Sequence, residues 1–429
     1  MKYTWEEVAR HSSPDDCWMV IKGQVYDVSA FWPSVHPGGH LLLDAAGLDA
    51  TSVFVSNHPT WVETCLSDDS YRESSHIRLL GQVEHDPARK EWQFEEPFYA
   101  ELKALVDRHP EWRNRYEWRT WAFVGLTVMI QMISWYTAVV RGNVWWLPLS
   151  ILSWVWNGFH VMHPINHGAL SSVRSKWWNG LLFFTYLNGI SSILWRRGHH
   201  MEHHAFTNHV EDGDIHHAPV LRQCEADRPL PHYRWQSVYM WFVYFFTHAS
   251  VMFYYLLHTG RVSYSRRSEV WMYYSGVAAM IALYLLVPSH LHSLRYGWLV
   301  LSVHIAAGGW IVSVIFGLNH TTGDAEFDST VHWAENSVRA SYNYSILPSR
   351  WTYLTLFVVG GLNYQIEHHL LPTVYHIHYP DISPHLRQLC EKYRLSYRFS
   401  PNVMHAIRKH QAYMSRLASY SMPLASPSQ

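Results

Sequence analysis

The sequence predicts a multi-pass α-helical membrane protein with four spanning helices, interfacial helices, a histidine-rich cytosolic cap and a small N-terminal α+β domain. Long apolar stretches begin near residue 118, and several are long enough to cross a bilayer, which requires about 20 residues. Residues 1–83 instead carry short apolar runs at 18–21 and 25–28, split by Lys22 and Gly23, which is a strand–turn–strand pattern. Histidine is unusually frequent, with 32 among 429 residues.

These patterns divide the chain into four parts. Residues 1–83 are the small domain, and 84–117 are a charged linker that includes an interfacial helix near 97–108. The membrane domain follows at 118–395, and a tail occupies 396–429.

Parity decides which apolar stretches span the membrane. The histidine-rich segments 163–217 and 320–378 must share one side if they build one site, so an even number of crossings separates them. Three apolar stretches lie between them. We expect 236–258 to lie in the interface, because tyrosines and a histidine interrupt it, and 180–195 to do likewise. The predicted spanning helices are then 119–140, 144–162, 269–288 and 297–318.

Composition excludes some partners and indicates a compartment. Basic and acidic residues nearly cancel, 33 against 34, so no nucleic-acid partner is expected. The four cysteines lie far apart and form no CxxC, which is typical of reduced thiols facing the cytosol. The N-terminus has no apolar signal-peptide core, so we expect the first domain to stay cytosolic.

A haem motif lies in the first domain. The letters HPGG at 36–39 precede GLDAT at 47–51, and a second histidine follows at position 58. A six-coordinate haem needs one imidazole on each face of the ring, contributed by separate helix–loop units. Around these residues the chain resembles cytochrome b5 over about 1–83. The resemblance implies a b-type haem with His36 and His58 as axial ligands.

Three histidine boxes lie in the membrane domain. They are HxxxH at 163–167, HxxHH at 200–204 and QxxHH at 365–369. Positions i, i+3 and i+4 of a helix share one face, so each box aims its imidazoles at one point. Iron accepts imidazole ligands, and two irons require about eight such donors, more than a zinc HExxH motif supplies.

The boxes and the apolar helices between them resemble the membrane fatty acyl desaturases across almost the whole chain. The fused haem domain and the glutamine of the third box resemble the front-end subgroup. The resemblance implies a di-iron centre, with no catalytic residue beyond the metal ligands His163, His167, His200, His203, His204, His320, His368 and His369. Gln365 stands where other desaturases have histidine, and it is a candidate for weak or water-mediated iron binding. His199 precedes the motif and is expected behind the ligands.

Box one departs from the family pattern, which has aspartate after its first histidine. Pro164 stands there and is expected to bias His163 away from helical geometry. His160, one turn earlier, is a possible substitute ligand. Four other histidines are expected not to bind metal: His216, His217, His376 and His378.

The resemblance implies an oxidoreductase of the endoplasmic reticulum membrane, with the haem domain and boxes facing the cytosol. It would use O2 to introduce a cis double bond into a fatty acyl chain carried by coenzyme A or a phospholipid. No GxGxxG follows a predicted strand, so electrons from NADH or NADPH would come through a separate cytochrome b5 reductase.

Three alternatives stay open at this point. A sphingoid long-chain-base desaturase shares the haem fusion and the QxxHH box, and its products would distinguish it. A fused lipid hydroxylase would be expected to carry histidine at position 365. A non-catalytic haem carrier is disfavoured by intact histidines in all three boxes, and its iron content would distinguish it.

Overall fold

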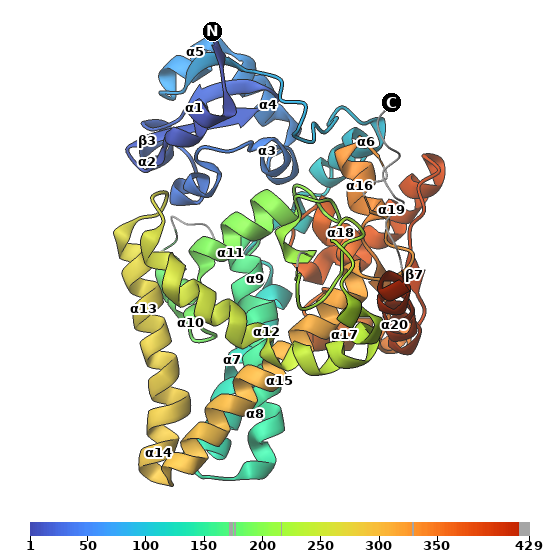
Figure 1. Ribbon diagram of the computed structural model, residues 1–429. Helices are drawn as coiled ribbons and strands as arrows, with labels where there is room; N and C mark the ends of the chain where they lie inside the picture. The colour runs from blue at the N-terminus through green and yellow to red at the C-terminus, as the bar shows by residue number, and fades with distance from the viewer. Residues whose placement is uncertain (171–174, 176, 216, 328–329, 420–429) are drawn as a thin grey trace.

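The computed structural model describes residues 1–170, 175, 177–215, 217–327 and 330–419. Figure 1 shows a small domain of strands and short helices at one end and a group of long helices reaching the opposite end. The C-terminal helices gather beside the upper ends of the long ones.

The N-terminal domain is built on a five-stranded sheet in the order β1-β5-β4-β3-β2. Strands β3 and β4 pair antiparallel across Lys22 and Gly23, whose φ angles of 50° and 73° suit a two-residue hairpin turn. The predicted strand–turn–strand pattern is therefore confirmed. The strands are β1 (Lys2–Tyr3), β2 (Ser12–Ser13), β3 (Asp16–Ile21), β4 (Gln24–Asp27) and β5 (Arg78–Val83). The helices are α1 (Trp5–Arg10), α2 (Phe31–Ser34), η1 (Gly39–Ala45), α3 (Thr51–Asn57), α4 (Thr60–Ser67) and α5 (Asp69–Ser74).

Four long helical paths connect the two ends of the membrane domain (Figure 1). Three of them contain a π-helical turn, a widened turn that is uncommon in proteins. The paths are α7 (Trp118–Trp135) with η3 (Tyr136–Val140); η4 (Val144–Trp146), α8 (Leu147–Asn157), η5 (Gly158–Met162) and α9 (His163–Asn166); α13 (Arg267–Ile281), η10 (Ala282–Leu286) and α14 (Val287–Leu291); and α15 (Leu294–His320).

The two hairpin turns at the far end of the molecule touch each other. His292 Nε2 lies 3.0 Å from the carbonyl oxygen of Val139, and the Tyr296 hydroxyl donates to the carbonyl of Ala138 at 2.5 Å. The turn between α7 and α8 and the turn between α14 and α15 therefore lie on the same side.

Length and composition alone select a slightly different set of spanning helices. Among the described residues they favour Pro110–Val140, Pro231–Arg261, Arg267–Leu291 and Leu294–His320. This set includes α12 (Gln236–His258) and omits the path through α8, where Asn157, His160 and several tryptophans lower the hydropathy.

Both ends of α12 contact elements near the histidine boxes. At its start, Gln236 donates to the carbonyl of Met414 on the C-terminal helix α20 (Val403–Ser419), which also contacts Thr321 beside the end of α15. Just beyond its end, Glu269 at the start of α13 contacts Arg196 beside box two. Both ends thus lie on the side of the boxes, and Figure 1 shows α12 running crosswise. The helix ends therefore support 144–162 as the fourth crossing.

Two further expectations have different outcomes. The stretch 180–195 is divided between α10 (Trp178–Tyr186) and α11 (Ser192–Gly198), each too short to span a bilayer. The linker helix exists as α6 (Pro97–Asp107), and its place in the membrane interface stays a prediction. Its apolar face, including Leu102 and Val106, is buried in a cluster with side chains of the C-terminal cap.

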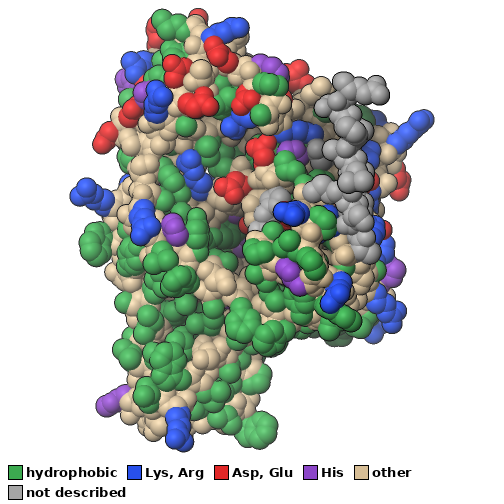
Figure 2. Space-filling model, in the orientation of Figure 1, with side chains coloured by type: hydrophobic (Ala, Val, Ile, Leu, Met, Phe, Trp, Pro, Cys, Tyr) green, Lys and Arg blue, Asp and Glu red, His purple; other side chains and the backbone are tan. Residues whose placement is uncertain are grey.

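The C-terminal cap consists of short elements around the third box. They are α16 (Trp333–Arg339), β6 (Asn343–Tyr344), η11 (Ser349–Trp351), α17 (Thr352–Val359), α18 (Gln365–Leu370), η12 (His376–His378), α19 (Tyr379–Lys392) and β7 (Phe399–Ser400). Short 3₁₀ turns complete the chain at η2 (Pro110–Arg113), η7 (Gly213–Ile215), η8 (Pro231–Trp235) and η9 (Thr259–Arg261), and η6 (His199–His203) is a further π-helical turn. Figure 2 shows hydrophobic side chains dominating the lower half of the visible face, with charged ones concentrated above.

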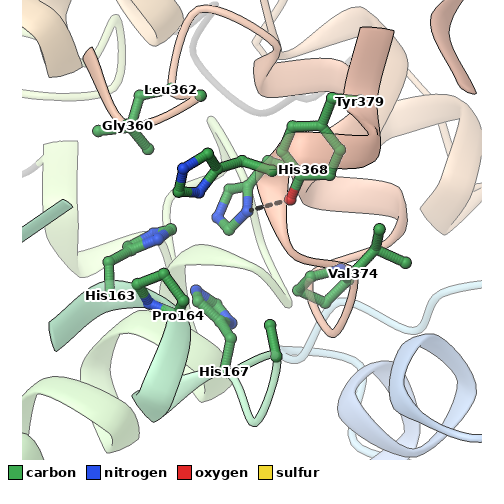
Figure 3. A pocket seen from close by; sticks show the side chains of 12 residues that line it. His163, Pro164, His167, Gly360, Leu362, His368, Val374 and Tyr379 are labelled. Carbon is green, nitrogen blue, oxygen red and sulfur yellow. Dashed lines mark hydrogen bonds between the residues drawn. The ribbon is translucent and has the colours of Figure 1, made fainter. Parts of the chain in front are cut away.

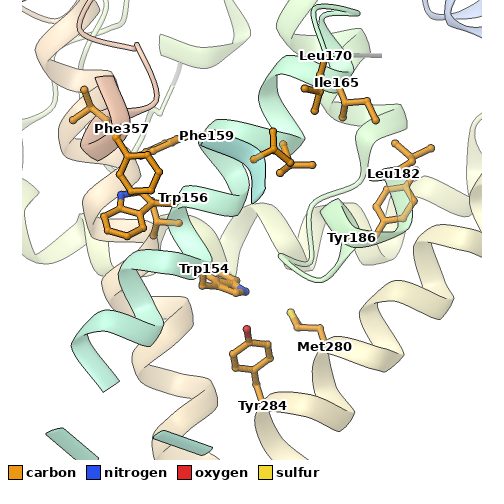
Figure 4. Close-up of a cluster of buried hydrophobic side chains, with 14 of the residues drawn as sticks. Trp154, Trp156, Phe159, Ile165, Leu170, Leu182, Tyr186, Met280, Tyr284 and Phe357 are labelled. Carbon is orange, nitrogen blue, oxygen red and sulfur yellow. The ribbon is translucent and has the colours of Figure 1, made fainter. Parts of the chain in front are cut away.

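The largest buried apolar cluster fixes α8 among its neighbours (Figure 4). The Trp154 indole donates to the carbonyl of Leu187, and the Trp156 indole donates to that of Val358, each at 3.0–3.1 Å. These bonds satisfy the only polar atom of each buried indole. They also set the direction in which α8 leads into box one.

Candidate metal and haem sites

Imidazoles from all three boxes and from the end of α15 gather in the interior. One group contains His163, His167, His199 and His368, and a second contains His203, His320 and His369. Within each group the nearest ligand atoms all lie within 4.8 Å of one another. His200 and His204 are buried between them, with ring centroids 4.6 Å from His167 and 4.3 Å from His369 respectively.

Box two is shaped by the π-helical turn η6 (His199–His203), closed by a 2.8 Å bond from the His204 amide to the His199 carbonyl. The widened turn changes which side chains share a face. His199 Nε2 lies 3.2 Å from His204 Nε2, which lies 3.1 Å from His368 Nε2. His199 is thus beside the box-one imidazoles, whereas its position outside the motif led us to expect it behind the ligands.

Box one keeps helical geometry despite its proline. His163 has φ −62° and ψ −52°, so the predicted bias away from a helix is wrong. A proline ring normally clashes with the carbonyl four residues earlier. Here the π-helical turn η5 precedes Pro164, and that carbonyl, on His160, accepts a bond from the Tyr375 hydroxyl at 3.3 Å.

His160, the possible substitute ligand, contacts the C-terminal cap. Its Nε2 lies 2.8 Å from the Phe357 carbonyl and its Nδ1 lies 3.1 Å from His376 Nε2, so both nitrogens are engaged. His378 is buried at the start of α19, and His217 is exposed. His216 lies outside the described residues.

Box three includes the glutamine on α18. Gln365 Nε2 lies 3.0 Å from His320 Nε2 and 3.1 Å from His369 Nε2, while its Oε1 accepts from Asn319. The amide oxygen and nitrogen exchange places by a half turn. In the turned orientation the oxygen would face the two imidazoles, and the nitrogen would face Asn319.

Four histidines of the cluster, His203, His320, His368 and His369, have an oxygen atom beside Nδ1. His203 Nδ1 lies 3.0 Å from both oxygens of Asp212, and the other three lie 3.1–3.3 Å from oxygen atoms. A proton held at Nδ1 leaves Nε2 as the ligand atom, and such supporting contacts are typical of metal-bound histidines. The other pairs are His320 with the Ala340 carbonyl, His368 with the Tyr379 hydroxyl and His369 with the Thr207 hydroxyl. Sequence reasoning missed these partners; only the acidic EDGD at 211–214 was a signal for Asp212.

The donor set fits a metal centre. The Nε2 atoms of His167, His200 and His203 are buried and have no hydrogen-bond partner among the described residues. Burial lowers the pKa of His200 to about 3 and holds those of His204, His368 and His369 well below 6.5, with help from neighbouring imidazoles. For His203, burial is outweighed by Asp212, which raises the pKa. Neutral imidazole is the form that binds metal.

A small cavity reaches this cluster (Figure 3). Its wall joins box one to the third box and to the segment before it, since His163, Pro164, Gly360, His368 and Tyr379 all line it. Gly360 has φ +60°, and an added Cβ would come within 2.2 Å of the Phe159 Cβ. The backbone therefore approaches η5, which continues α8, more closely here than any other residue would allow.

The two expected haem ligands face each other in the N-terminal domain. The rings of His36 and His58 have centroids 6.0 Å apart and planes inclined by 55°. His58 Nδ1 lies 3.0 Å from the Phe54 carbonyl, which leaves its Nε2 toward the gap between the rings. The arrangement fits one axial nitrogen on each side of a haem.

Comparison with known proteins agrees with this geometry. Residues 143–401 match the family described as fatty acid desaturase. The chain belongs to the fatty acid desaturase family. Residues 4–77 of this desaturase match the cytochrome b5-like haem/steroid binding domain, so its cofactors are a di-iron centre and a haem.

Similar proteins place the desaturase in the front-end, cytochrome b5-fused group. It is 28% identical to the acyl-lipid (8-3)-desaturase of Physcomitrium patens, over 97% of this chain and 91% of that protein. It is 26% identical to the Delta(5) fatty acid desaturase A of Dictyostelium discoideum, over 99% and 96%. The sn-1 linoleoyl-lipid 6-desaturase of Arthrospira platensis is 28% identical over 68% of this chain and 84% of its own.

Proposed function

We propose that this front-end desaturase binds its two irons through the eight histidines of the boxes and α15, with Gln365 as a weak or water-mediated ligand. The set is His163, His167, His200, His203, His204, His320, His368 and His369. His199 is a further candidate because of its position beside His204. The observation that carries the proposal is the convergence of these imidazoles, four of which (His203, His320, His368 and His369) already have an oxygen partner at Nδ1. His36 and His58 are proposed as the haem ligands, and the boundaries 1–83, 84–117, 118–395 and 396–429 as the domain limits.

The protein contributes positioning more than acid–base chemistry. When bound, the irons supply the O2 chemistry that removes two hydrogens from adjacent methylenes. Each double bond consumes one O2, two electrons and two protons, and releases two waters. Asp212 orients His203, while Tyr379 orients His368 beside the cavity. Pro164 and Gly360 contribute no polar side chain to the cavity wall.

The proposed substrate is a polyunsaturated acyl chain carried by a phospholipid, with an acyl-coenzyme A as the other candidate. The names of the Physcomitrium patens and Arthrospira platensis relatives contain acyl-lipid and linoleoyl-lipid, which favours a lipid carrier over coenzyme A. The position of the new double bond is left to product analysis.

The proposed location is the endoplasmic reticulum, with the haem domain and boxes in the cytosol. Apolar side chains are exposed on the outer faces of the spanning helices, including Met132 on α7, Leu286 in η10 and Leu299 on α15, where lipid would cover them. A cytosolic haem domain would be accessible to a nicotinamide-dependent cytochrome b5 reductase.

Expression in a yeast host tests the proposal. Cells fed linoleic, α-linolenic or dihomo-γ-linolenic acid should form a product with a new cis double bond on the carboxyl side of the existing ones. The lipid class in which the product first appears identifies the carrier. New double bonds in sphingoid bases would instead support the long-chain-base alternative, and hydroxylated acyl chains the hydroxylase alternative.

A further inference from the structure

The haem domain and the desaturase domain share one hydrophobic core. Ile193, Met201 and Tyr264 of the desaturase domain are buried in the same cluster as Phe31 and Leu43 of the haem domain. Met201 belongs to box two, between His200 and His203. The haem domain therefore packs directly against the segment that carries box two, since η1 contacts α11 and α3 contacts η6 (Figure 1).

A buried ionic network crosses this interface. Arg196 on α11 donates from Nε to Asp44 of the haem domain at 2.6 Å and from Nη1 to Glu269 on α13 at 2.9 Å. The side chains of Arg196, Asp44 and Glu269 are 1%, 8% and 2% exposed, so water does not screen the interaction. One guanidinium thus bridges carboxylates from the two domains.

Arg197 adds a second connection to the same loop. Its Nη1 donates to the backbone carbonyls of Asp44 and Ala46, at 3.1 Å and 2.9 Å, and its guanidinium lies over the Tyr264 ring. Both arginines lie just before box two, whose first histidine, His200, is three residues after Arg197. Movement of the haem domain would therefore displace the segment that carries box two or break these hydrogen bonds.

Such a network specifies orientation more than it adds stability. Desolvation of buried charges offsets much of their attraction, yet removing one partner leaves the others buried and uncompensated. The planar guanidinium also donates hydrogen bonds to carboxylates in only a few geometries. An apolar interface alone would tolerate sliding, whereas this pairing selects one position of the haem domain.

We propose that Arg196 is a positioning residue that holds the haem domain in the pose from which it passes electrons to the metal site of the same chain. Helix α3 (Thr51–Asn57), which ends just before His58, contacts η6 in this pose. A haem held by His36 and His58 would supply one electron in each of two transfers per double bond, and the proposed reductase would restore each electron. This inference rests on the proposed ligands and electron source.

The test uses the full-length holoenzyme in nanodiscs of dilinoleoyl-phosphatidylcholine. Asp44→Asn removes the charge that Arg196 binds and keeps the size of the side chain. Asp69→Asn, which affects an exposed pair with Arg72 in the same domain, is the matched control. Haem absorbance is measured first. The rate of haem reduction by NADH and cytochrome b5 reductase is measured next, followed by the rate of haem reoxidation on mixing with O2. The rate of trypsin cleavage in the linker is measured separately.

Asp44→Asn should keep its haem and its rate of reduction but show about tenfold slower reoxidation and faster linker cleavage, since the docked pose is less populated. The control should match wild type. Arg196→Gln should act similarly, and the double variant should be no worse than either single one, because both act through one contact. If Asp44→Asn loses haem, Arg197→Gln is measured in its place.

Reoxidation and cleavage both within twofold of wild type would overturn the proposal. Wild-type haem that is not reoxidised through the metal site would instead contradict the proposed function. The docking proposal would then be decided by linker cleavage, which requires neither substrate nor iron.

Discussion

His203 and Asp212 form a buried pair in which the imidazole Nδ1 lies 3.0 Å from both carboxylate oxygens. Both side chains are 0% exposed. The carboxylate fixes the ring orientation and keeps the proton on Nδ1, so that Nε2 is directed toward His320 and His369. The pair therefore links a residue that no box contains to the proposed metal centre.

We predict that Asp212→Asn lowers iron affinity by about 10- to 100-fold, the usual loss when such a supporting contact is removed. The amide retains the shape but not the charge that favours a proton at Nδ1. Iron per chain should be measured after dialysis against increasing chelator. Asp324→Asn, which alters a surface pair with Lys409, is the control. Equal iron retention in both variants would contradict this role.

Gln365 is the most informative position of the third box. Its amide is within 3.1 Å of two imidazoles and is also tied to Asn319. We predict that Gln365→Ala nearly abolishes desaturation and that Gln365→His is also impaired, because a shorter, more rigid donor alters the coordination. Product yield should be measured at equal protein and haem content. Gln411→Ala, on the C-terminal helix, is the control. Full activity of Gln365→Ala would show that the residue neither binds nor supports iron.

Sequence spacing predicted the boxes because the histidines of each box lie within a few residues of one another on a single helix. It failed where the helix is not a regular α-helix. The π-helical turns at His199–His203 and Gly158–Met162 change the register, so the expectations for His199 and for Pro164 differ from the structure. The partners of the ligands, such as Asp212 and Tyr379, depend on tertiary packing, which spacing does not encode. The linker helix α6 has the amphipathic pattern of an interfacial helix, and only its neighbours reveal that its apolar face is buried.

The haem assignment gives a spectroscopic prediction. His36→Ala should abolish the b-type absorption spectrum, because one face of the haem loses its ligand. The membrane domain should remain folded, as judged by size-exclusion profile and iron content. His85→Ala, an exposed residue paired with Glu91, should have no effect. A normal haem spectrum in His36→Ala would refute the assignment.

The topology is tested with glycosylation acceptor sites placed on the full chain. Sites inserted at 141–143 or within 289–296 should be modified, because both turns lie at the end away from the boxes. Sites near 210 and at the N-terminus should not be modified. Modification near 210 would mean that α12 crosses the membrane and that the parity argument fails.

The last prediction separates His160 from His163, which lie one turn apart on the helical path through α8. Both nitrogens of His160 are engaged by Phe357 and His376, so its contribution is to packing between α8 and the C-terminal cap. His163 instead has its ring centroid 4.6 Å from that of His368. His160→Gln should therefore lower the free energy of unfolding by about 1–3 kcal/mol, the cost of leaving buried polar partners unsatisfied. This variant should retain iron. His163→Gln should lose iron with little change in stability of the metal-free protein. Iron content and thermal unfolding of the metal-free and iron-loaded forms should be compared for the two variants. Loss of iron in His160→Gln together with retention in His163→Gln would reverse the assignment and make His160 the box-one ligand.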